Sequence, residues 1–457
     1  MTPEKNKRIS IIGLGVSGLA VLEKLSSLGA DLFLSEAKPR DKIDKKILRK
    51  IDSFKINAEF GKHTSKILDG AGLIVVSPGV DTSQSVLRRA AKKRIQIISE
   101  VELASQFLKK PVIAVTGTNG KTTTVELIVS LLKSGKLKTV AAGNIGYPLM
   151  SVNDSRIDCI VAEISSYQLE NIVKFKPYIS VILNITEDHL MRHKNMEKYS
   201  LSKARIFENQ KEKDCLIYNI DDPLVKGISG RAKCIKIPFS IQRKLKKGIY
   251  VDDGRIISLI HGKKMEICKA SEIKLRGLHN LQNALAAAAS ALVCGVSAKD
   301  IKRALMAFKG VEHRIEYVSK IKGVSFYNDS KATNPDSAIV AVNALYPDSK
   351  IVLILGGEDK KTSLSELSSV VKKKVKEVVL IGKAAKRFKK DLGKAGFRRV
   401  TLERSMKDAV KRSFQLAESG DTVLLSPACA SFDMFSNFEE RGEVFKKSVE
   451  QLAGSKK

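Results

Sequence analysis

The sequence predicts an α/β protein with mostly parallel sheets, divided into about three domains. The length of 457 residues suggests this number at roughly 150 residues per domain. Short apolar, β-branched runs alternate with amphipathic helical stretches along the whole chain, which is typical of βα units. Two glycine-rich loops each follow one of these runs and precede a helical stretch. That arrangement is typical of nucleotide-binding α/β domains.

Nine runs are the clearest predicted strands. They are continuously apolar, as strands buried on both faces of a parallel sheet are expected to be. The nine runs are Ile9–Ile12, Leu32–Leu34, Leu73–Val76, Val112–Val115, Cys159–Ala162, Ile179–Leu183, Ile351–Leu355, Val378–Ile381 and Thr422–Leu425.

Two breaks divide the pattern. A Lys-Lys-Pro sequence at residues 109–111 separates an N-terminal unit from the strand that follows. The second break lies near residues 310–321, after an Ala-rich helix predicted over residues 280–294 and before a new apolar run over 324–327. Residues 214–275 look different: they predict short strands and turns, with no clean helix.

Composition excludes several classes of protein. Hydrophobic residues make up 43% of the chain, aromatic residues 5%, and there is no Trp. Cores built on Leu, Ile, Val and Ala are therefore expected, and a disordered or collagen-like chain is excluded. The six cysteines lie far apart and form no C-x-x-C pair. We therefore expect reduced thiols, and neither a disulfide scaffold nor a zinc ribbon.

The N-terminus imitates an export signal, because Lys5, Lys7 and Arg8 precede an apolar run over Ile9–Leu22. Three glycines interrupt that run and no small-residue cleavage site follows it, so we expect no export. No segment approaches the about 20 uninterrupted apolar residues that span a bilayer. The expectation is a cytoplasmic protein that does not bind membranes.

The first glycine loop has the pattern G-x-G-x-x-G over Gly13–Gly18, directly after a predicted strand. Its glycines permit a tight turn and the close approach of a phosphate to a helix N-terminus. Glu36 ends the next strand, where a dinucleotide fold places its ribose-binding carboxylate. The loop Ser77-Pro78-Gly79 ends at the same sheet edge. By itself this pattern indicates an NAD-dependent dehydrogenase, or a glycine turn needed only for packing.

The second glycine loop, Thr116–Thr123, reads T-G-T-N-G-K-T-T. In such a loop, backbone N–H groups cradle phosphates, Lys121 reaches the β/γ oxygens and the Thr122 hydroxyl binds Mg²⁺. The glycine that an ordinary Walker A pattern has at its first position is absent. The strand–loop–helix context still favours an NTP site. Since a dehydrogenase does not need ATP, the two loops together indicate an enzyme that couples ATP hydrolysis to a nucleotide-bearing substrate.

Several motifs together resemble the Mur ligases, the ATP-dependent amide-bond-forming enzymes of peptidoglycan synthesis. The resemblance covers nearly the whole chain. Its motifs are the loop Thr116–Thr123, G-N-I-G at Gly143–Gly146, E-I-S-S-Y-Q-L-E at Glu163–Glu170, N-I-T-E-D-H-L at Asn184–Leu190, and His313-Arg314. D-S-K-A-T-N at Asp329–Asn334 and S-P-A-C-A-S-F-D at Ser426–Asp433 are typical of the branch that joins D-glutamate to UDP-N-acetylmuramoyl-L-alanine.

The resemblance implies three domains with different tasks. Residues 1–110 would form a Rossmann-like domain for the UDP substrate, and residues 111–312 a P-loop-type ATPase domain with a parallel sheet. Residues 313–457 would form a Rossmann-like domain for the amino acid. The implied reaction forms an acyl phosphate from ATP and a substrate carboxylate, which the amine of D-glutamate then displaces, releasing ADP and phosphate. Cations positioned at the phosphates would supply most of the catalysis.

The resemblance also implies the catalytic and metal-binding residues. Lys121 would neutralise the phosphates, and Thr122 and Glu163 would hold one Mg²⁺. His189 would reach a second Mg²⁺, whose other ligand would be Lys203 as a carbamate, an oxygen-donor anion that suits this hard cation. Taken singly, His189 would be an ordinary loop histidine, Lys203 a solvated helix lysine and Glu163 a helix N-terminal carboxylate.

The remaining implied contacts fall into three groups. The ATP group is Gly117, Thr118, Asn119, Gly120, Lys121, Thr122, Thr123, Asn283, Arg314 and Asp329. The UDP-substrate group is Val16, Ser17, Glu36, Ser77, Pro78, Gly79, Asn144 and His189, with added charge from Lys38. The D-glutamate group is Lys331, Thr333, Lys360, Ser431, Phe432 and Phe438, which offers the cations and hydroxyl donors that a dicarboxylate needs.

Two departures from the family pattern weaken particular assignments. Met191 stands where the family usually has a second aspartate near the implied metal ligand His189. The second strand ends at Glu36 and Lys38 where relatives often show D-x-R. The other notable side chains have structural interpretations: His63, His193 and His261 as ordinary histidines, and Cys429 as a packing residue.

Rival functions remain to be distinguished. The formal net charge is +32, from 81 Lys and Arg residues against 49 Asp and Glu residues. This excess of positive charge suggests the hypothesis that the protein binds nucleic acid. The lysines are spread over every helical stretch without aromatic residues between them, so we expect no nucleic-acid partner. Another Mur-type amino-acid ligase is the main alternative, although the D-N-P-R string of the diaminopimelate- or lysine-adding enzyme is missing. We expect a monomer that uses ATP and Mg²⁺.

Overall fold

The computed structural model describes residues 7–81, 83–188, 190–260, 262–275, 277–346, 348–359 and 361–454, without the side chains of 190, 191 and 454. The chain forms two compact units. Unit 1 comprises Met1–Glu272 and Gln282–Met306, and unit 2 comprises Ile273–Leu281 and Ala307–Lys457.

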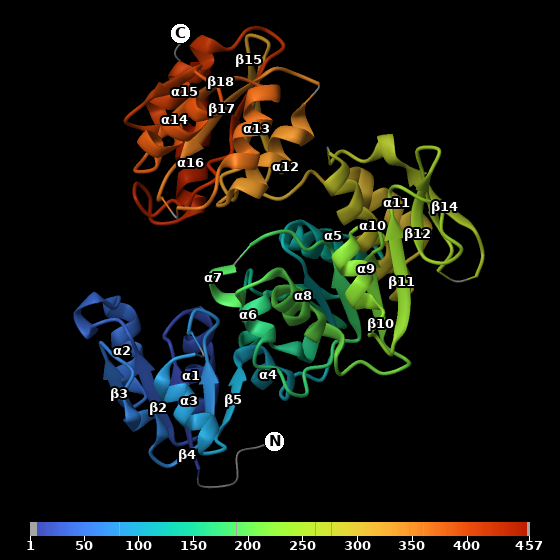
Figure 1. Ribbon diagram of the computed structural model, residues 1–457. Coiled ribbons are helices and arrows are strands. Elements are labelled where there is room, and N and C mark those ends of the chain that lie inside the picture. Colours follow the sequence, from blue (N-terminus) through green and yellow to red (C-terminus); the bar gives the residue numbers. More distant parts are fainter. Residues whose placement is uncertain are drawn as a thin grey trace. The chain divides into compact units, whose positions relative to one another are not determined.

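The first sheet of unit 1 has five parallel strands in the order β3-β2-β1-β4-β5. Its strands are β1 (Arg8–Ile12), β2 (Leu32–Glu36), β3 (Asn57–Phe60), β4 (Ala71–Val76) and β5 (Gln96–Ser99). The accompanying helices are α1 (Val16–Ser27), α2 (Lys45–Ser53), α3 (Ser85–Lys92) and α4 (Glu100–Ser105), with short 3-10 turns η1 (Arg40–Lys42) and η2 (Ser65–Leu68). This sheet is blue in Figure 1.

The second sheet of unit 1 has nine strands in the order β14-β13-β12-β11-β10-β9-β6-β8-β7. In this order, all neighbouring strands from β12 through β11, β10, β9, β6 and β8 to β7 pair in parallel. Strands β12, β13 and β14 pair antiparallel and form one edge of the sheet. They are β6 (Val112–Thr116), β7 (Thr139–Gly143), β8 (Cys159–Glu163), β9 (Ile179–Ile182), β10 (Cys215–Asn219), β11 (Ile235–Ser240), β12 (Ile249–Asp252), β13 (Arg255–Ser258) and β14 (Met265–Lys269).

The helices around this sheet position the site residues. The longer ones are α5 (Lys121–Ser134), α8 (Met196–Ala204), α10 (Leu278–Val293) and α11 (Ala298–Ala307). The shorter ones are α6 (Ser166–Leu169), α7 (Leu190–His193), α9 (Pro223–Ser229), η3 (Leu149–Ser151), η4 (Asp154–Arg156), η5 (Arg205–Phe207) and η6 (Ala270–Glu272).

Unit 2 contains a six-stranded sheet in the order β15-β16-β20-β17-β18-β19, parallel except for the β15–β16 pair. Its strands are β15 (Glu316–Ile321), β16 (Val324–Asn328), β17 (Ile351–Gly356), β18 (Val375–Ile381), β19 (Val400–Leu402) and β20 (Thr422–Leu425). Its helices are α12 (Pro335–Leu345), α13 (Ser365–Lys374), α14 (Ala385–Lys394), α15 (Met406–Leu416) and α16 (Phe438–Gly454), and they lie on both faces of the sheet (Figure 1).

Burial in unit 2 explains the continuous apolar runs. Ile351, Leu353 and Leu355 of β17 belong to one core cluster, while Val352 and Ile354 belong to another. Successive side chains of a strand point to opposite faces, so both faces of this sheet are buried. An alternating pattern would leave one face polar; a parallel sheet covered by helices requires an unbroken apolar run.

The structure confirms the α/β fold class with three sheets and most of the predicted elements. All nine predicted runs are strands, and the Ala-rich helix is α10. The expectation of no helix in residues 214–275 is wrong, because α9 lies there. The Asp222 side chain accepts hydrogen bonds from the backbone N–H groups of Leu224 and Val225, and Pro223 occupies the first turn. An Asp cap followed by Pro is a helix-start signal strong enough for a seven-residue helix.

No helix among the described residues combines the length and apolar character needed to cross a bilayer. Each predicted domain contains one of the three sheets. The limits of the two compact units, however, do not coincide with the predicted domain boundaries, because unit 1 contains two of these sheets. The boundaries at 110/111 and 312/313 therefore stay predictions.

Candidate active site

The second glycine loop connects β6 to α5, and two of its glycines have positive φ angles. Gly117 has φ of +156° and Gly120 has φ of +84°, and the second lies in the left-handed region that favours glycine. A Cβ atom at Gly120 would lie 2.4 Å from Oδ1 of Asn283. The structure thus brings Asn283, a predicted ATP contact from α10, directly against the loop.

Two lysine side chains converge on one carbonyl oxygen of this loop. Lys121 Nζ donates to the Gly117 carbonyl at 2.9 Å and to the Thr118 carbonyl at 2.8 Å. Lys203 Nζ, from α8, donates to the same Gly117 carbonyl at 2.9 Å. Lys203 is buried, with its ammonium 4.6 Å from the ring centroid of Tyr199. Burial, together with the nearby Lys121 ammonium, holds the pKa of Lys203 well below its ordinary value.

Both carboxylate oxygens of Glu163, at the end of β8, are held by predicted site residues. The Thr122 hydroxyl donates to Oε2 at 2.7 Å, and the Asn144 side-chain amide donates to Oε1 at 2.9 Å. The Asn144 backbone N–H also donates to the Glu163 carbonyl at 2.8 Å. A hydroxyl and a carboxylate in direct contact form an oxygen donor set of the kind that Mg²⁺ prefers.

Sequence reasoning gave no role to two residues that support the loop. Asn184 Oδ1 accepts from the Asn119 backbone N–H at 2.8 Å, and its Nδ2 donates to the Asn119 carbonyl at 3.1 Å. The Tyr199 hydroxyl lies 3.2 Å from the Thr118 hydroxyl. Asn184 opens the N-I-T-E-D-H-L string, so its position after a strand was an available signal; Tyr199 had none.

The first glycine loop is closed by the side chain of Glu36. Its Oε2 accepts from the Leu14 backbone N–H, and its Oε1 accepts from the Lys38 backbone N–H at 2.8 Å. The Ser77 hydroxyl donates to the Gly13 carbonyl at 2.8 Å. The structure therefore brings Glu36 and Ser77 to the glycine loop. Val16, at the start of α1, is 73% exposed.

Arg192 connects this region with the second sheet of unit 1. Its Nη1 donates to the Pro78 carbonyl at 3.3 Å, and its guanidinium forms a bidentate pair with Glu170, at distances down to 2.6 Å. The guanidinium also lies 4.4 Å from the ring centroid of Tyr167. A bidentate pair of this kind holds its side chains in a defined geometry, so Arg192 holds Pro78 beside the Glu163–Glu170 segment.

In unit 2, Asp329 is buried beside the predicted ATP residue Arg314. The Ser426 hydroxyl donates to its Oδ2 at 2.7 Å, and the Ile315 backbone N–H donates to Oδ1 at 3.2 Å. Burial raises the pKa of Asp329 to about 7, while these hydrogen bonds and the Arg314 charge oppose the rise.

Four predicted D-glutamate contacts lie on two loops and at the start of α16 in the same unit. Lys331 Nζ is 5.1 Å from the ring centroid of Phe438. On the loop after β20, Ser431 is buried whereas Phe432 is 68% exposed.

Sequence reasoning missed Arg441 of α16, which is fully buried and joins the two loops. Its Nε and Nη2 donate to the hydroxyl and carbonyl oxygens of Ser330, at 3.0 and 2.7 Å. Its Nη1 donates to the carbonyls of Cys429 and Ala430, at 3.0 and 3.2 Å. Burial lowers the pKa of Arg441 to about 10, which leaves the guanidinium charged at neutral pH. No local sequence signal distinguishes it from a surface arginine.

The structure thus places predicted residues in three neighbourhoods, each described by itself. The first comprises Lys121, Thr122, Asn144, Glu163, Lys203 and Asn283, and the second Glu36, Ser77 and Pro78, with Val16 and Ser17 at the start of α1. The third lies in unit 2 and comprises Arg314, Asp329, Lys331, Thr333, Ser431, Phe432 and Phe438. His189, Lys360 and His261 lie outside the described residues, as does the Met191 side chain.

The structural interpretations of the other histidines and of Cys429 agree with their surroundings. The Cys429 side chain is buried. His63 Nδ1 lies 2.7 Å from the Ser35 hydroxyl, and His193 Nε2 lies 3.0 Å from the Ser166 hydroxyl.

Comparison with known families gives three matches in the order of the three sheets. Residues 7–99 match the domain described as "Mur ligase MurD-like, N-terminal domain". Residues 115–291 match "Mur ligase middle domain", and residues 313–429 match "Mur ligase, glutamate ligase domain".

Curated proteins named UDP-N-acetylmuramoylalanine--D-glutamate ligase are similar to the chain over nearly its whole length. The one from Thermoanaerobacter pseudethanolicus is 46% identical over 452 residues, which cover 98% of this chain and 99% of that protein. The one from Caldanaerobacter subterraneus is 43% identical with the same coverage.

Solved structures share the fold at low identity. UDP-N-acetylmuramate-alanine ligase MurC from Thermotoga maritima has a TM-score of 0.58 at 20% identity, covering 98% of this chain and all of that one. MurF ligase from the same organism, solved in complex with ADP, has a TM-score of 0.60 at 18% identity, covering 92% and 95%.

Proposed function

The chain belongs to the Mur ligase family, and we propose that it joins D-glutamate to UDP-N-acetylmuramoyl-L-alanine with hydrolysis of ATP. Eight relatives that are 40–46% identical over 98% of the chain bear the name of that ligase. Another Mur-type amino-acid ligase is the alternative. Peptidoglycan precursors are made in the cytoplasm by this family, and we place the reaction there.

The observation that carries the proposal is the cluster around Glu163. Thr122 and Asn144 hold its two carboxylate oxygens, and the ammonium groups of Lys121 and Lys203 lie on the adjoining loop. Thr122 and Glu163 would hold Mg²⁺, which would offset negative charge on the phosphates. Lys121 would face the transferring phosphoryl group, where positioned cations stabilise the developing charge.

The reaction would proceed in two displacements. A carboxylate oxygen of the UDP substrate attacks the γ-phosphorus, the bond to the β-phosphate oxygen breaks, and ADP leaves. The amine of D-glutamate then attacks the acyl carbon, and phosphate leaves with the electrons of the C–O bond. The first step needs cations at the phosphates, and the second needs the amine in its neutral form.

We further propose that Lys203 acts as a carbamate, together with His189 at a second Mg²⁺. A carbamate forms from CO₂ and a neutral amine, and a buried lysine whose charged form is disfavoured supplies such an amine. In its buried position, the Lys203 ammonium donates to the Gly117 carbonyl and lies over the Tyr199 ring.

The substrates are assigned to the domains in the predicted order. Residues 1–110 would bind the UDP group through Val16, Ser17, Glu36 and the loop Ser77–Gly79. Residues 111–312 would bind ATP through the Thr116–Thr123 loop and Asn283, with Arg314 and Asp329 contributing from residues 313–457. D-Glutamate would contact Lys331, Thr333, Lys360, Ser431, Phe432 and Phe438. The protein would act as a monomer without nucleic acid.

The test is ADP release with UDP-N-acetylmuramoyl-L-alanine and a panel of amino acids. Turnover with D-glutamate alone is expected. Turnover with L-lysine, diaminopimelate or L-alanine in its place would support the alternative, and the absence of amino-acid-dependent ADP release would contradict both.

A further inference from the structure

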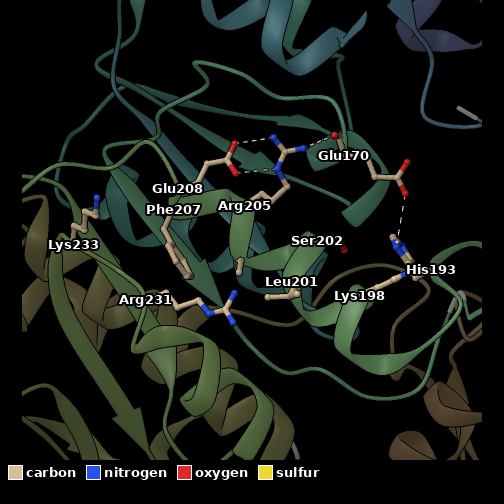
Figure 2. A pocket seen from close by; sticks show the side chains of 11 residues that line it. Glu170, His193, Lys198, Leu201, Ser202, Arg205, Phe207, Glu208, Arg231 and Lys233 are labelled. Atoms are coloured by element: carbon tan, nitrogen blue, oxygen red, sulfur yellow. Dashed lines mark hydrogen bonds and ion pairs between the residues drawn. The ribbon is translucent and has the colours of Figure 1, made fainter. Parts of the chain in front are cut away.

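Unit 1 contains a cavity of about 630 Å³ beside α8. Eleven residues line it: Glu170, His193, Lys198, Leu201, Ser202, Ala204, Arg205, Phe207, Glu208, Arg231 and Lys233 (Figure 2). Lys198, Leu201, Ser202 and Arg205 follow the spacing i, i+3, i+4, i+7, which places them on one face of a helix. The volume falls in the range of small-molecule sites.

The rim of this cavity carries an excess of positive charge. Both lining carboxylates are already paired with arginines, Glu208 with Arg205 at 2.9 Å and Glu170 with Arg192 at 2.6 Å. By contrast, Lys198, Arg231 and Lys233 make no side-chain hydrogen bond or ion pair with any residue that the structure describes. These three residues are called the cationic rim below. Three cations without carboxylate partners favour an anion.

The interior is partly apolar. Leu201, Ala204 and Phe207 line it together with the cationic rim, and Phe207 is buried. Figure 2 shows the Phe207 ring between the paired Arg205–Glu208 and the Arg231 side chain. An anion with an apolar group would satisfy both surfaces, whereas a bare inorganic anion would use only the rim.

The cavity is separate from the Lys203 contact with the glycine loop, but it touches the same helix. Ser202 and Ala204, which flank Lys203 in the chain, both line the cavity, while the Lys203 ammonium contacts Gly117. A ligand in the cavity would therefore press on the helical turn that holds Lys203.

We propose that this cavity is a regulatory site for a small organic anion with an apolar group, such as an alkyl phosphate or an alkyl carboxylate. The binding part stands on the cavity alone. The regulatory part, a change in turnover through α8, rests on the proposed function.

The binding test is calorimetric titration at low salt, without nucleotide, UDP substrate or amino acid. The probes are hexyl phosphate, heptanoate and inorganic phosphate. One equivalent of hexyl phosphate or heptanoate is expected to bind, and inorganic phosphate more weakly. The pair Arg231→Ala/Lys233→Ala should weaken binding by about tenfold or more, as the loss of two exposed ion pairs would. The control pair Lys226→Ala/Lys236→Ala removes equal charge from exposed positions that lie within five residues of Arg231 or Lys233 in the sequence and do not line the cavity, and it should leave binding unchanged.

Three results would overturn the site. Equal weakening by the control pair would mean diffuse charge attraction. Loss of binding in Lys121→Ala, but not in the rim pair, would place the probe on the glycine loop. Equal affinity for inorganic phosphate and hexyl phosphate would mean that the apolar group of the ligand contributes nothing to binding. Hexyl phosphate could bind as expected and still leave the rate of ADP release by the parent protein unchanged. That result would contradict the regulatory role of the cavity but not the proposed ligase function.

Discussion

At the scale of single residues, the candidate site depends on charged groups that are buried. Lys203 and Glu163 lie within the same loop cluster and are both buried. Buried charges are costly unless they are paired, coordinated or neutralised. Such positions are where reactive or metal-binding groups concentrate.

Lys203→Ala is expected to be nearly inactive in ADP release, because the proposed oxygen-donor ligand is lost. Short carboxylic acids should restore part of the rate by supplying oxygens in the vacated space. Lys203→Arg should be rescued less, since its guanidinium fills the space and stays charged. Wild-type turnover by Lys203→Ala, or no rescue by any small carboxylate, would contradict the carbamate and mean that Lys203 is an ordinary buried lysine.

Glu100 of α4 predicts a pH-dependent stability. Burial raises the pKa of its carboxyl to about 7, against 4.5 as its ordinary value, with one hydrogen bond from the Met150 N–H opposing the rise. The folded state therefore holds a proton that the unfolded state releases. This stabilisation is complete below about pH 4.5 and is lost as the pH rises through about 7, up to about 3 kcal/mol.

Glu100→Gln is neutral at every pH and should not show this loss. The free energy of unfolding of Glu100→Gln, relative to the parent protein, is expected to rise between pH 5 and pH 8 in urea titrations. The exposed Glu212→Gln serves as the control. A pH-independent difference for Glu100→Gln would contradict the buried, protonated carboxyl.

At the scale of elements, loops at the carboxyl ends of parallel strands form the site, and a few contacts fix their shape. Gly120→Ala should distort the glycine loop, because φ is +84° and the new Cβ would lie 2.4 Å from Asn283 Oδ1. Gly29→Ala is a matched control with φ of +72° and nothing within 4 Å.

Both alanine variants should lose about 1 kcal/mol of stability from backbone strain. Only Gly120→Ala should also weaken ADP binding, by about tenfold or about 1.4 kcal/mol, because its Cβ would displace the turn that is proposed to cradle the phosphates. If Gly120→Ala and Gly29→Ala bind ADP with equal affinity in calorimetry, the Asn283 side chain must move aside, and its contact with Gly120 does not determine the shape of the loop.

Arg441 of α16 holds two loops of unit 2 through four backbone and hydroxyl oxygens. Arg441→Lys keeps the charge but cannot reach all four, so unit 2 should lose about 3 kcal/mol through unsatisfied buried carbonyls. The KM for D-glutamate should rise while the KM for the UDP substrate stays unchanged. A uniform fall in kcat with both KM values unchanged would contradict a positioning role.

At the scale of the whole molecule, the net charge of +32 should govern non-specific association. Binding to duplex DNA is expected at low salt, and its affinity should fall by about 10³-fold or more between 50 and 200 mM salt, as counterion release predicts. Fluorescence anisotropy with a labelled duplex measures this. Affinity that persists at 200 mM salt would indicate a specific nucleic-acid partner and contradict the sequence prediction.

The sequence by itself determined the α/β class, the nine clearest strands and the two glycine loops, since each depends on neighbours within a few residues. The same local logic predicted Lys121 as a phosphate-binding residue and Thr122 as a Mg²⁺ ligand. Its one wrong element, in residues 214–275, came from overlooking the Asp-Pro start of α9, although that signal is also local.

The tertiary structure decided which distant residues meet. Thr122 and Glu163 are 41 positions apart, Gly117 and Lys203 are 86 apart, and Ser330 and Arg441 are 111 apart. The burial of Lys203, the role of Arg441 and the cavity beside α8 all follow from such contacts. Periodicity and turn chemistry report only the local backbone, whereas burial and electrostatic environment are set by whichever elements the folded sheet brings together.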